Sequence, residues 1–195
     1  NEINGIIALG NWNQLKDLQL QNNQITDITP LVENIGISCV IRLHENPLNN
    51  TALSTHIPAL EARGITVEYD MPEGVVLFKD ANLEKEIREA LGIPTELLKK
   101  EDLAKLKGLV ADGGFSWDPK LAEEEKIQDL TGLEHCIGLQ LLNLRNHQIS
   151  DVSALAPLTK LSNIDLSFNQ LSDVSSLANL TSLTQLNLSD NGQLS

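Results

Sequence analysis

The sequence is poor in aromatic residues, in cysteine and in positive charge. Aromatic side chains make up 3% of the 195 residues, and there are two cysteines. With 14 basic against 27 acidic residues, the formal net charge is −13. A surface of that sign repels phosphate backbones and anionic lipid, so we expect neither nucleic acid nor a membrane surface as a partner. No apolar run approaches the ~18 residues of a membrane-spanning helix, so no membrane insertion is expected.

Motifs for catalysis or for metal binding are also lacking. The histidines stand at positions 44, 56, 135 and 147 without HxxxH spacing, and there is no CxxC. No Ser–His–Asp pattern, glycine-rich phosphate loop or P-loop occurs. Cys136 stands where the neighbouring repeats carry leucine, so a small buried thiol is favoured there over a bridge to Cys39. We therefore predict no catalytic residue, metal or cofactor.

The chain does contain a leucine pattern with a period of 22 residues. Three rows of aliphatic residues keep this spacing: Leu139, Leu161 and Leu183; Leu142, Ile164 and Leu186; and Leu144, Leu166 and Leu188. The same phrase, LxxLxLxxNxI, opens at Leu15 in a separate first block. Units that repeat at this period cannot bury their apolar faces alone, so the pattern predicts turns stacked as parallel strands.

The pattern divides the chain into three segments. Residues 1–70 are predicted to be the end of a first repeat array, with a helix from Thr55 that ends at Gly64 and a finishing strand at residues 65–69 as its C-terminal cap. Residues 127–195 resume the period as the start of a second array, which has no cap. Both ends of the chain lie inside a repeat, which suggests a fragment of a longer solenoid.

Residues 71–126 differ in composition, because they hold more than half of the charged residues, and two predicted helices directly before the second array indicate that they form its helical cap. Asp80 can cap a helix that Gly92 and Pro94 end, with an apolar face of Leu83, Ile87, Ala90 and Leu91. A second helix is predicted to carry Leu98, Leu103, Leu106 and Leu109. An alternative geometry keeps one continuous sheet, with residues 49–126 inserted between its two halves.

These phrases resemble the leucine-rich repeat family, in particular the 22-residue internalin-like class of bacterial surface and secreted proteins. The step I-x-D-[IV] is the most specific part of the match; its aspartate recurs at positions 27, 129, 151 and 173, with a leucine replacing one aliphatic residue of the step at the second and fourth of these. The resemblance implies an α/β solenoid with a curved parallel sheet and an extracellular or cell-surface location. It also implies a non-catalytic protein that binds a protein or glycan through the concave sheet face.

Polar residues at fixed repeat positions have a predicted structural role. Asn23, Asn46, Asn169 and Asn191 are expected to form a ladder that satisfies buried backbone groups of adjacent turns. His147 interrupts this ladder, and a bond to the loop backbone is favoured over a ligand role. Asp27, Asp151 and Asp173 are expected to accept hydrogen bonds from backbone N–H groups of the next turn.

Residues that alternate with the inward leucines are the candidate binding residues. They include Gln19, Gln21, Asn143, Arg145, Asn163, Asp165, Phe168, Gln185 and Asn187, with Ser167 and Ser189 beside them. Of these, Arg145 and Phe168 are the types that dominate protein-binding hot spots. Solvated strand faces without a ligand are the competing interpretation. Oxygens of Asn143, Asp165 and Asn187 could suit calcium, but strands ~4.8 Å apart hold them too widely spaced.

Two further hypotheses concern the inserted loop and the ends of the arrays. Phe115 and Trp117 lie on a loop that interrupts the repeat register, where they either bind a ligand or plug the core. Trp12 occupies a leucine position and is expected to pack. As an alternative to binding, the chain could be a structural spacer that self-associates head to tail through its uncapped ends.

Overall fold

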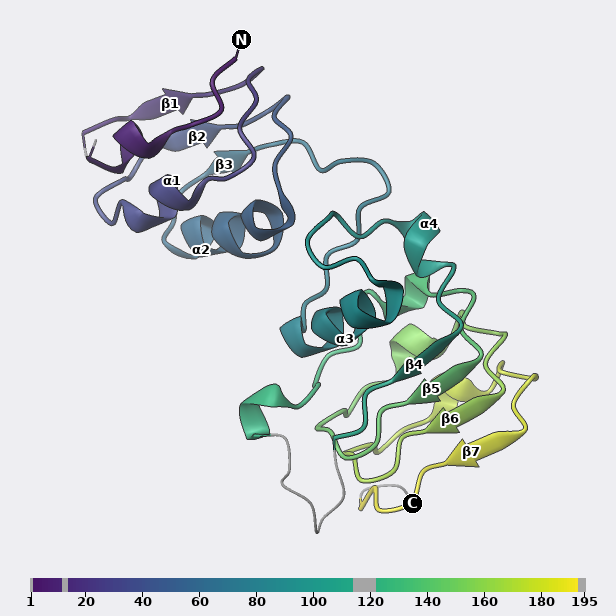
Figure 1. The fold of residues 1–195 in the computed structure, drawn as a ribbon. Coiled ribbons are helices and arrows are strands. Elements are labelled where there is room, and N and C mark those ends of the chain that lie inside the picture. The colour runs from purple at the N-terminus through teal and green to yellow at the C-terminus, as the bar shows by residue number, and fades with distance from the viewer. Residues whose placement is uncertain (1, 12–13, 114–121, 193–195) are drawn as a thin grey trace. The chain divides into compact units, whose positions relative to one another are not determined.

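The computed structural model describes residues 2–11, 14–113 and 122–192. The chain divides into two units, each with its own parallel sheet (Figure 1). Unit 1 comprises residues 1–75 and 95–97, and unit 2 comprises residues 76–94 and 98–195. Among the described residues, no strand of one sheet pairs with a strand of the other, which contradicts the alternative of one continuous sheet.

Unit 1 holds a three-stranded sheet in the order β1-β2-β3. Its elements are a 3₁₀ helix (Ile7–Asn11), β1 (Asp17–Gln19), α1 (Thr29–Glu33), β2 (Val40–Arg42), a π-helical turn (Ala52–His56), α2 (Ile57–Ala62) and β3 (Val67–Glu68). The predicted helix is present, although its first turn is π-helical, and Gly64 follows it with a φ of 79°. The predicted strand pairs with β2 at the edge of the sheet.

Unit 2 holds a four-stranded sheet in the order β4-β5-β6-β7, whose strands lie side by side in Figure 1. Its helices are α3 (Ala81–Leu91) and α4 (Lys100–Leu103), and its strands are β4 (Gly108–Val110), β5 (Leu141–Asn143), β6 (Asn163–Asp165) and β7 (Gln185–Asn187). Short 3₁₀ helices span Glu123–Glu125, Leu133–His135, Ser153–Leu155 and Ser175–Leu177. The prediction of an α/β solenoid with parallel sheets in two blocks is confirmed.

The sequence period of 22 residues equals the separation between paired residues on β5, β6 and β7 of the second sheet. Leu142 lies opposite Ile164, which in turn lies opposite Leu186, in parallel pairing. Leu139 and Leu161 in the flanking row are both 0% exposed. At about 0.8 kcal/mol for each buried CH₂ group, such rows supply the main stabilising term of each turn. The interior is therefore a stack of aliphatic rungs, one from each repeat.

The region before the second array departs from the prediction in one helix. As expected, Asp80 caps α3 by accepting hydrogen bonds from two backbone N–H groups, and Gly92 ends the helix in the left-handed conformation. The predicted second helix is wrong beyond Leu103, because α4 is one turn long and Leu109 lies in β4 opposite Leu142. Leu106 and Leu109 fit both helical spacing and the LxxLxL phrase that Ala111 completes, and in the structure the sheet pairing prevails.

Buried asparagines connect successive turns through their side-chain amides. The Oδ1 of Asn169 accepts the N–H of Ile149 at 3.0 Å, and its Nδ2 donates to the carbonyl of Leu144 at 2.8 Å. Asn191 makes the same two bonds one turn later, to Leu171 and Leu166. The amide thus satisfies backbone groups that the outward bend of the chain would leave buried and unpaired.

His147 takes the same place in this ladder. Its Nδ1 accepts the N–H of Ile127 at 3.2 Å, and its Nε2 lies 2.7 Å from the carbonyl of Ala111. Those two residues flank an insertion that lengthens this turn relative to the 22-residue period. The imidazole therefore holds both ends of the insertion with bonds equivalent to those of Asn169, which confirms its structural role.

The aspartates of the I-x-D-[IV] step cap the turns opposite the sheet. Oδ1 atoms of Asp27, Asp151 and Asp173 accept the N–H of Thr29, Ser153 and Ser175, at 2.7 to 2.8 Å. Hydrogen bonds from the Thr29 side chain and backbone hold the pKa of Asp27 below its usual value. Their predicted role is confirmed.

We expect Asn169→Ala to lower the free energy of unfolding by about 3 kcal/mol. The substitution leaves the Ile149 N–H and the Leu144 carbonyl buried without partners, and each such group costs about 1–3 kcal/mol. Urea unfolding followed by circular dichroism measures the loss. Asn187→Ala on the exposed sheet face is the control and should cost less than about 1 kcal/mol. Equal losses in the two variants would contradict the ladder's role.

The stability of unit 2 should fall as pH drops below the usual pKa of histidine, about 6.5. Burial lowers the pKa of His147, so the unfolded chain takes up a proton there that the folded chain resists. The free energy of unfolding is then greatest above that pH and decreases toward the lowered pKa of the folded state. Urea midpoints at pH 5 and 7.5 test this, and His147→Asn should reduce the difference. An unchanged difference would exclude His147 as its source.

Both cysteines are free and buried, Cys39 in unit 1 and Cys136 in unit 2. Burial raises the pKa of the Cys136 thiol to about 12, so the reactive thiolate is scarce at neutral pH. We expect the native protein to resist iodoacetamide over minutes, and both thiols to react in denaturant. Mass spectrometry counts the modified sites. Rapid labelling of Cys136 in the native protein would contradict its burial.

Candidate functional site

The exposed face of the second sheet gathers the sequence-predicted residues into rows. Asn143, Asp165 and Asn187 share one row, because β5, β6 and β7 pair them directly. Asn163 and Gln185 share the next row with Leu141. Side chains in such a row stand about 4.8 Å from their neighbours, within reach of direct contact. The face is thus a continuous surface built from three repeats.

Side-chain amides hydrogen-bond along these rows. Asn163 donates through Nδ2 to Oε1 of Gln185 at 2.7 Å, and Asn187 donates through Nδ2 to Oδ2 of Asp165 at 3.1 Å. The Asn187 contact thus presents an amide nitrogen to the Asp165 carboxylate, which is the wrong atom for a calcium site. Among the described residues, no group of three or more His, Cys, Asp or Glu side chains could hold a metal ion.

Asp165 is held as a carboxylate by its neighbours. Burial alone would raise its pKa, but hydrogen bonds from Ser167 and Asn187 and the charge of Arg145 together lower it. Ser167 donates both its backbone N–H and its hydroxyl to Oδ1 of Asp165, at 2.9 and 2.6 Å. The expectation that Ser167 faces the ligand is wrong, because it is 0% exposed in making these bonds.

Arg145 and Phe168 form a pair at the end of this face. The guanidinium carbon of Arg145 lies 4.7 Å from the centroid of the Phe168 ring, which is a cation–π distance. Phe168 remains 39% exposed. An exposed aromatic ring held beneath a cation offers a large contact area whose position is already set.

The backbone at Phe168 is strained. Its φ is 57°, in the left-handed region that glycine, asparagine and aspartate tolerate best. Every ladder residue is preceded by a residue of positive φ: Asn22, Glu45, Asn146, Phe168 and Asp190. Three of the other four are asparagine or aspartate, whereas a phenylalanine there costs about 1 kcal/mol. An aromatic residue at this position is therefore not explained by the fold.

The sequence analysis missed an aliphatic part of the same face. Val110 on β4 and Leu141 on β5 are 61% and 41% exposed. Together with Asn163, Asp165 and Gln185 they line a shallow hollow of about 250 Å³. The exposure of Leu141 could have been predicted from the sequence, because Leu141 lies between the inward residues Leu139 and Leu142. The exposure of Val110 could not, because the sequence predicts a helix where the structure has β4.

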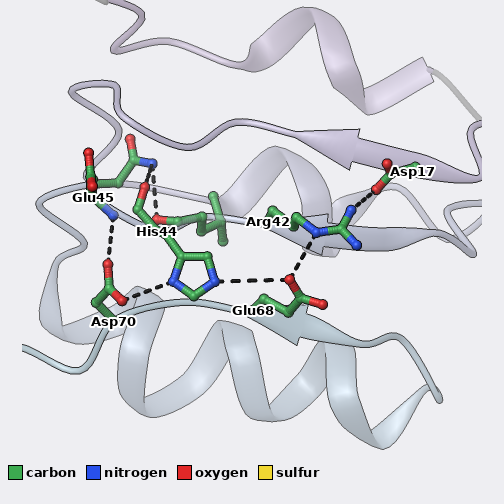
Figure 2. Close-up of polar contacts among 8 residues, drawn as sticks. Asp17, Arg42, His44, Glu45, Glu68 and Asp70 are labelled. Atoms are coloured by element: carbon green, nitrogen blue, oxygen red, sulfur yellow. Dashed lines mark hydrogen bonds and ion pairs between the residues drawn. The ribbon is translucent and has the colours of Figure 1, made fainter.

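The exposed face of the first sheet carries a charged network around two residues that sequence reasoning also missed, Arg42 and His44 (Figure 2). Arg42 contacts Asp17 on β1, and its Nε lies 2.9 Å from Oε2 of Glu68 on β3. Nδ1 of His44 lies 2.9 Å from Oδ1 of Asp70, and its Nε2 lies 4.0 Å from Glu68. Val40, Arg42 and His44 alternate with the inward residues Ile41 and Leu43, and this alternation could have placed them on the exposed face. The one-residue insertion in this turn obscured the repeat register and hence the alternation.

Asp70 fixes the end of this network. Oδ1 accepts a hydrogen bond from His44 and Oδ2 accepts the backbone N–H of Glu45 at 2.8 Å. These two bonds, that of His44 first, lower the pKa of the Asp70 carboxyl. Of the predicted residues in unit 1, Gln19 donates to Asp17 at 2.9 Å, and Gln21 is exposed on the same face.

Three predicted aromatic positions lie outside the described residues: Trp12, Phe115 and Trp117. Their assignments as packing or loop residues stay predictions, as does head-to-tail association.

No described helix is long and apolar enough to cross a membrane. The division into arrays with caps also stays a prediction, although α3 packs beside β4 at one edge of the second sheet.

Similar solved structures come from bacterial repeat proteins. An internalin (InlF) from Listeria monocytogenes is 34% identical, with a TM-score of 0.51, and the match covers 58% of this chain and 31% of that one. The functional domain of InlJ from the same species is 26% identical, with a TM-score of 0.46 and coverages of 57% and 22%. A leucine-rich repeat protein from Leptospira interrogans is 16% identical over 97% of this chain and 59% of that one, with a TM-score of 0.32.

This chain therefore spans under a third of InlF and of InlJ, and more than half of the Leptospira protein. No protein-family model and no curated protein matches the sequence.

Proposed function

Because the chain is a leucine-rich repeat protein of the internalin-like class, we propose that it is a non-catalytic binding module. In this proposal the exposed sheet face of unit 2 recognises the ligand, a protein or a glycan. We also propose an extracellular or cell-surface location, in keeping with the internalin-like class.

The observation that carries this proposal is the strained, exposed aromatic residue at the end of the face. A left-handed phenylalanine costs stability, and such strain is retained chiefly where it serves a site. In this conformation the Phe168 ring is exposed and lies beside the guanidinium of Arg145. Aromatic and arginine side chains contribute most of the binding free energy in protein interfaces.

The rest of the face supports recognition rather than chemistry. Paired amides on β6 and β7 present donors and acceptors in fixed directions, while Val110 and Leu141 add exposed aliphatic area. Side chains that already hold one another lose little conformational entropy when a ligand binds. This mixture suits the polar and apolar groups of a protein surface or the hydroxyls and ring faces of a glycan.

We expect Phe168→Asn to weaken ligand binding at least tenfold with little effect on folding. Relief of the left-handed strain, about 1 kcal/mol, offsets the lost cation–π contact, about 0.5–1 kcal/mol, so stability stays within about 1 kcal/mol of wild type. Ligands are first found with a glycan array and a display library of extracellular domains. Surface plasmon resonance then compares affinities, and urea unfolding measures stability.

Ile137→Asn is the matched control, because it removes a similarly exposed apolar side chain from unit 2 that is not on the sheet face. It should bind like wild type. If every ligand binds Phe168→Asn as tightly as wild type, unit 2's face is not the binding surface. A large loss of stability in Phe168→Asn would instead assign the ring to the core.

A further inference from the structure

β4 forms one edge of the second sheet, on the side where α3 packs (Figure 1). Backbone bonds through the Lys107 carbonyl and the Ala111 N–H tie this strand to β5. Because the direction of these groups alternates along a strand, the N–H and C=O groups of Gly108 and Val110 point away from β5. Among the described residues, no residue forms a hydrogen bond with these four groups. The outer edge of β4 therefore offers two donors and two acceptors to a further strand.

A hollow of about 410 Å³ lies beside the start of β4, between this strand and the end of α3. Leu91 and Ile93 give it an apolar lining and pack against the core of unit 2. Nη1 of Arg88 donates to the carbonyl of Ile93 at 3.0 Å, which holds the segment after α3 in place. Gly108 also lines the hollow, so the space is continuous with the edge of β4. A side chain of a strand paired with β4 can enter this preformed space.

Lysines make this hollow locally basic in an acidic chain. Lys105 and Lys107 line it together with one carboxylate, that of Asp102, which lies 2.8 Å from the ammonium of Lys105. Lys107 is exposed, and its ammonium pairs with no carboxylate of the residues that the structure describes. Exposed charges more than about 8 Å apart are screened at physiological salt. The nearby ammonium groups, rather than the net charge of −13, therefore determine that the hollow favours a carboxylate.

Strand geometry indicates the other side chains of such a partner. A strand added to β4 lies about 4.8 Å from it, and its residues alternate between the two sides of the sheet. On one side the exposed Val110 favours an apolar neighbour. On the other side the apolar lining suits the methylene groups of a glutamate, and Lys107 suits its carboxylate. A glycan has no series of backbone N–H groups to match the edge, whereas an extended peptide does.

We propose that the outer edge of β4 is a docking surface for an extended segment of a partner protein in which apolar and acidic residues alternate. The backbone of this segment pairs with Gly108 and Val110, and one of its carboxylates binds Lys107. This inference goes beyond the function proposed above, because it concerns the edge of the second sheet rather than its exposed face. Either proposal can fail without the other.

The test measures, by fluorescence anisotropy, how the full chain binds a short fluorescein-labelled peptide in which valine and glutamate alternate. The wild-type protein should bind this peptide more tightly than the corresponding valine–lysine peptide. General attraction to the acidic chain predicts the opposite order, so equal binding or a preference for the lysine peptide would overturn the proposal.

Pairing through the backbone is tested with two N-methylated forms of the valine–glutamate peptide. One form is methylated at every valine and the other at every glutamate. Because alternate N–H groups of a strand face the same neighbour, one form loses the donors that face β4 and the other keeps them. We expect about tenfold weaker binding for one form only. Equal affinities for the two forms would exclude strand pairing.

Gly108→Pro removes one of the outward N–H groups and should weaken binding of the valine–glutamate peptide about fivefold. Gly108→Ala is the matched control, because it keeps the N–H and its methyl group comes no closer than 3.9 Å to Leu141. It should bind within about twofold of wild type. Urea unfolding verifies that both variants fold, and the methylated peptides decide if Gly108→Pro does not. Equal losses in two folded variants would contradict the proposal.

Lys107→Gln should weaken binding about threefold, as expected for one exposed ion pair. Its control is Lys79→Gln, which removes the same charge from a side chain that is 69% exposed and lies near Asp129. Equal losses would deny Lys107 a specific role. Phe168→Asn should leave peptide binding unchanged, so that failure of the exposed face and failure of the edge are distinguishable. A wild-type dimer that Gly108→Pro dissociates would assign the edge to a second copy of the chain and overturn the proposal.

Discussion

The structure depends on one constraint: at every outward bend, the backbone groups of neighbouring turns must find partners inside the protein. Asn169 meets it by accepting an N–H from one turn and donating to a carbonyl of that same turn. Strands of three residues form few backbone hydrogen bonds with their neighbours, so the side-chain amides of the ladder fix much of the register between repeats. His147 shows that the requirement is for a donor and an acceptor at fixed places, because an imidazole supplies both across an insertion.

This constraint limits where binding residues can stand. Leucine rows occupy the inward positions and the ladder occupies the bend, so on the sheet side of each repeat the outward positions are the alternate strand residues and the left-handed residue before each ladder residue. Phe168 uses the second kind of position in spite of its conformational cost. The pairing with Arg145 turns a structural position of the repeat into part of an exposed surface.

The two sheets use the same scaffold for different surfaces. Unit 2 presents paired amides, two exposed aliphatic residues and the Arg145–Phe168 pair. Unit 1 presents carboxylates arranged around Arg42 and His44. Because solenoid repeats contact mainly their neighbours, each face can change without disturbing the interior of the other.

Period and residue type were enough to predict the inward rows, the asparagine ladder, the Asp80 cap and the placement of Asn163, Asp165 and Gln185 on one face. Errors arose where one phrase fits two structures. Leu106 and Leu109 satisfy the helical spacing that begins at Leu103 as well as the strand phrase, and local sequence cannot choose between the two structures. Ser167 has the polarity of a surface residue, and only the position of the Asp165 carboxylate explains its burial.

By itself, then, the sequence determined which side chains turn inward, since a strict period leaves one way to bury the leucines. Tertiary structure decided which outward side chains meet. Asp17 and Arg42 are 25 residues apart in the chain, and His44 and Asp70 are 26 apart. Such contacts depend on the register between turns, and a one-residue insertion in β2's turn is enough to hide that register from the sequence. The charged face of unit 1 could be recognised only when the three strands were in place.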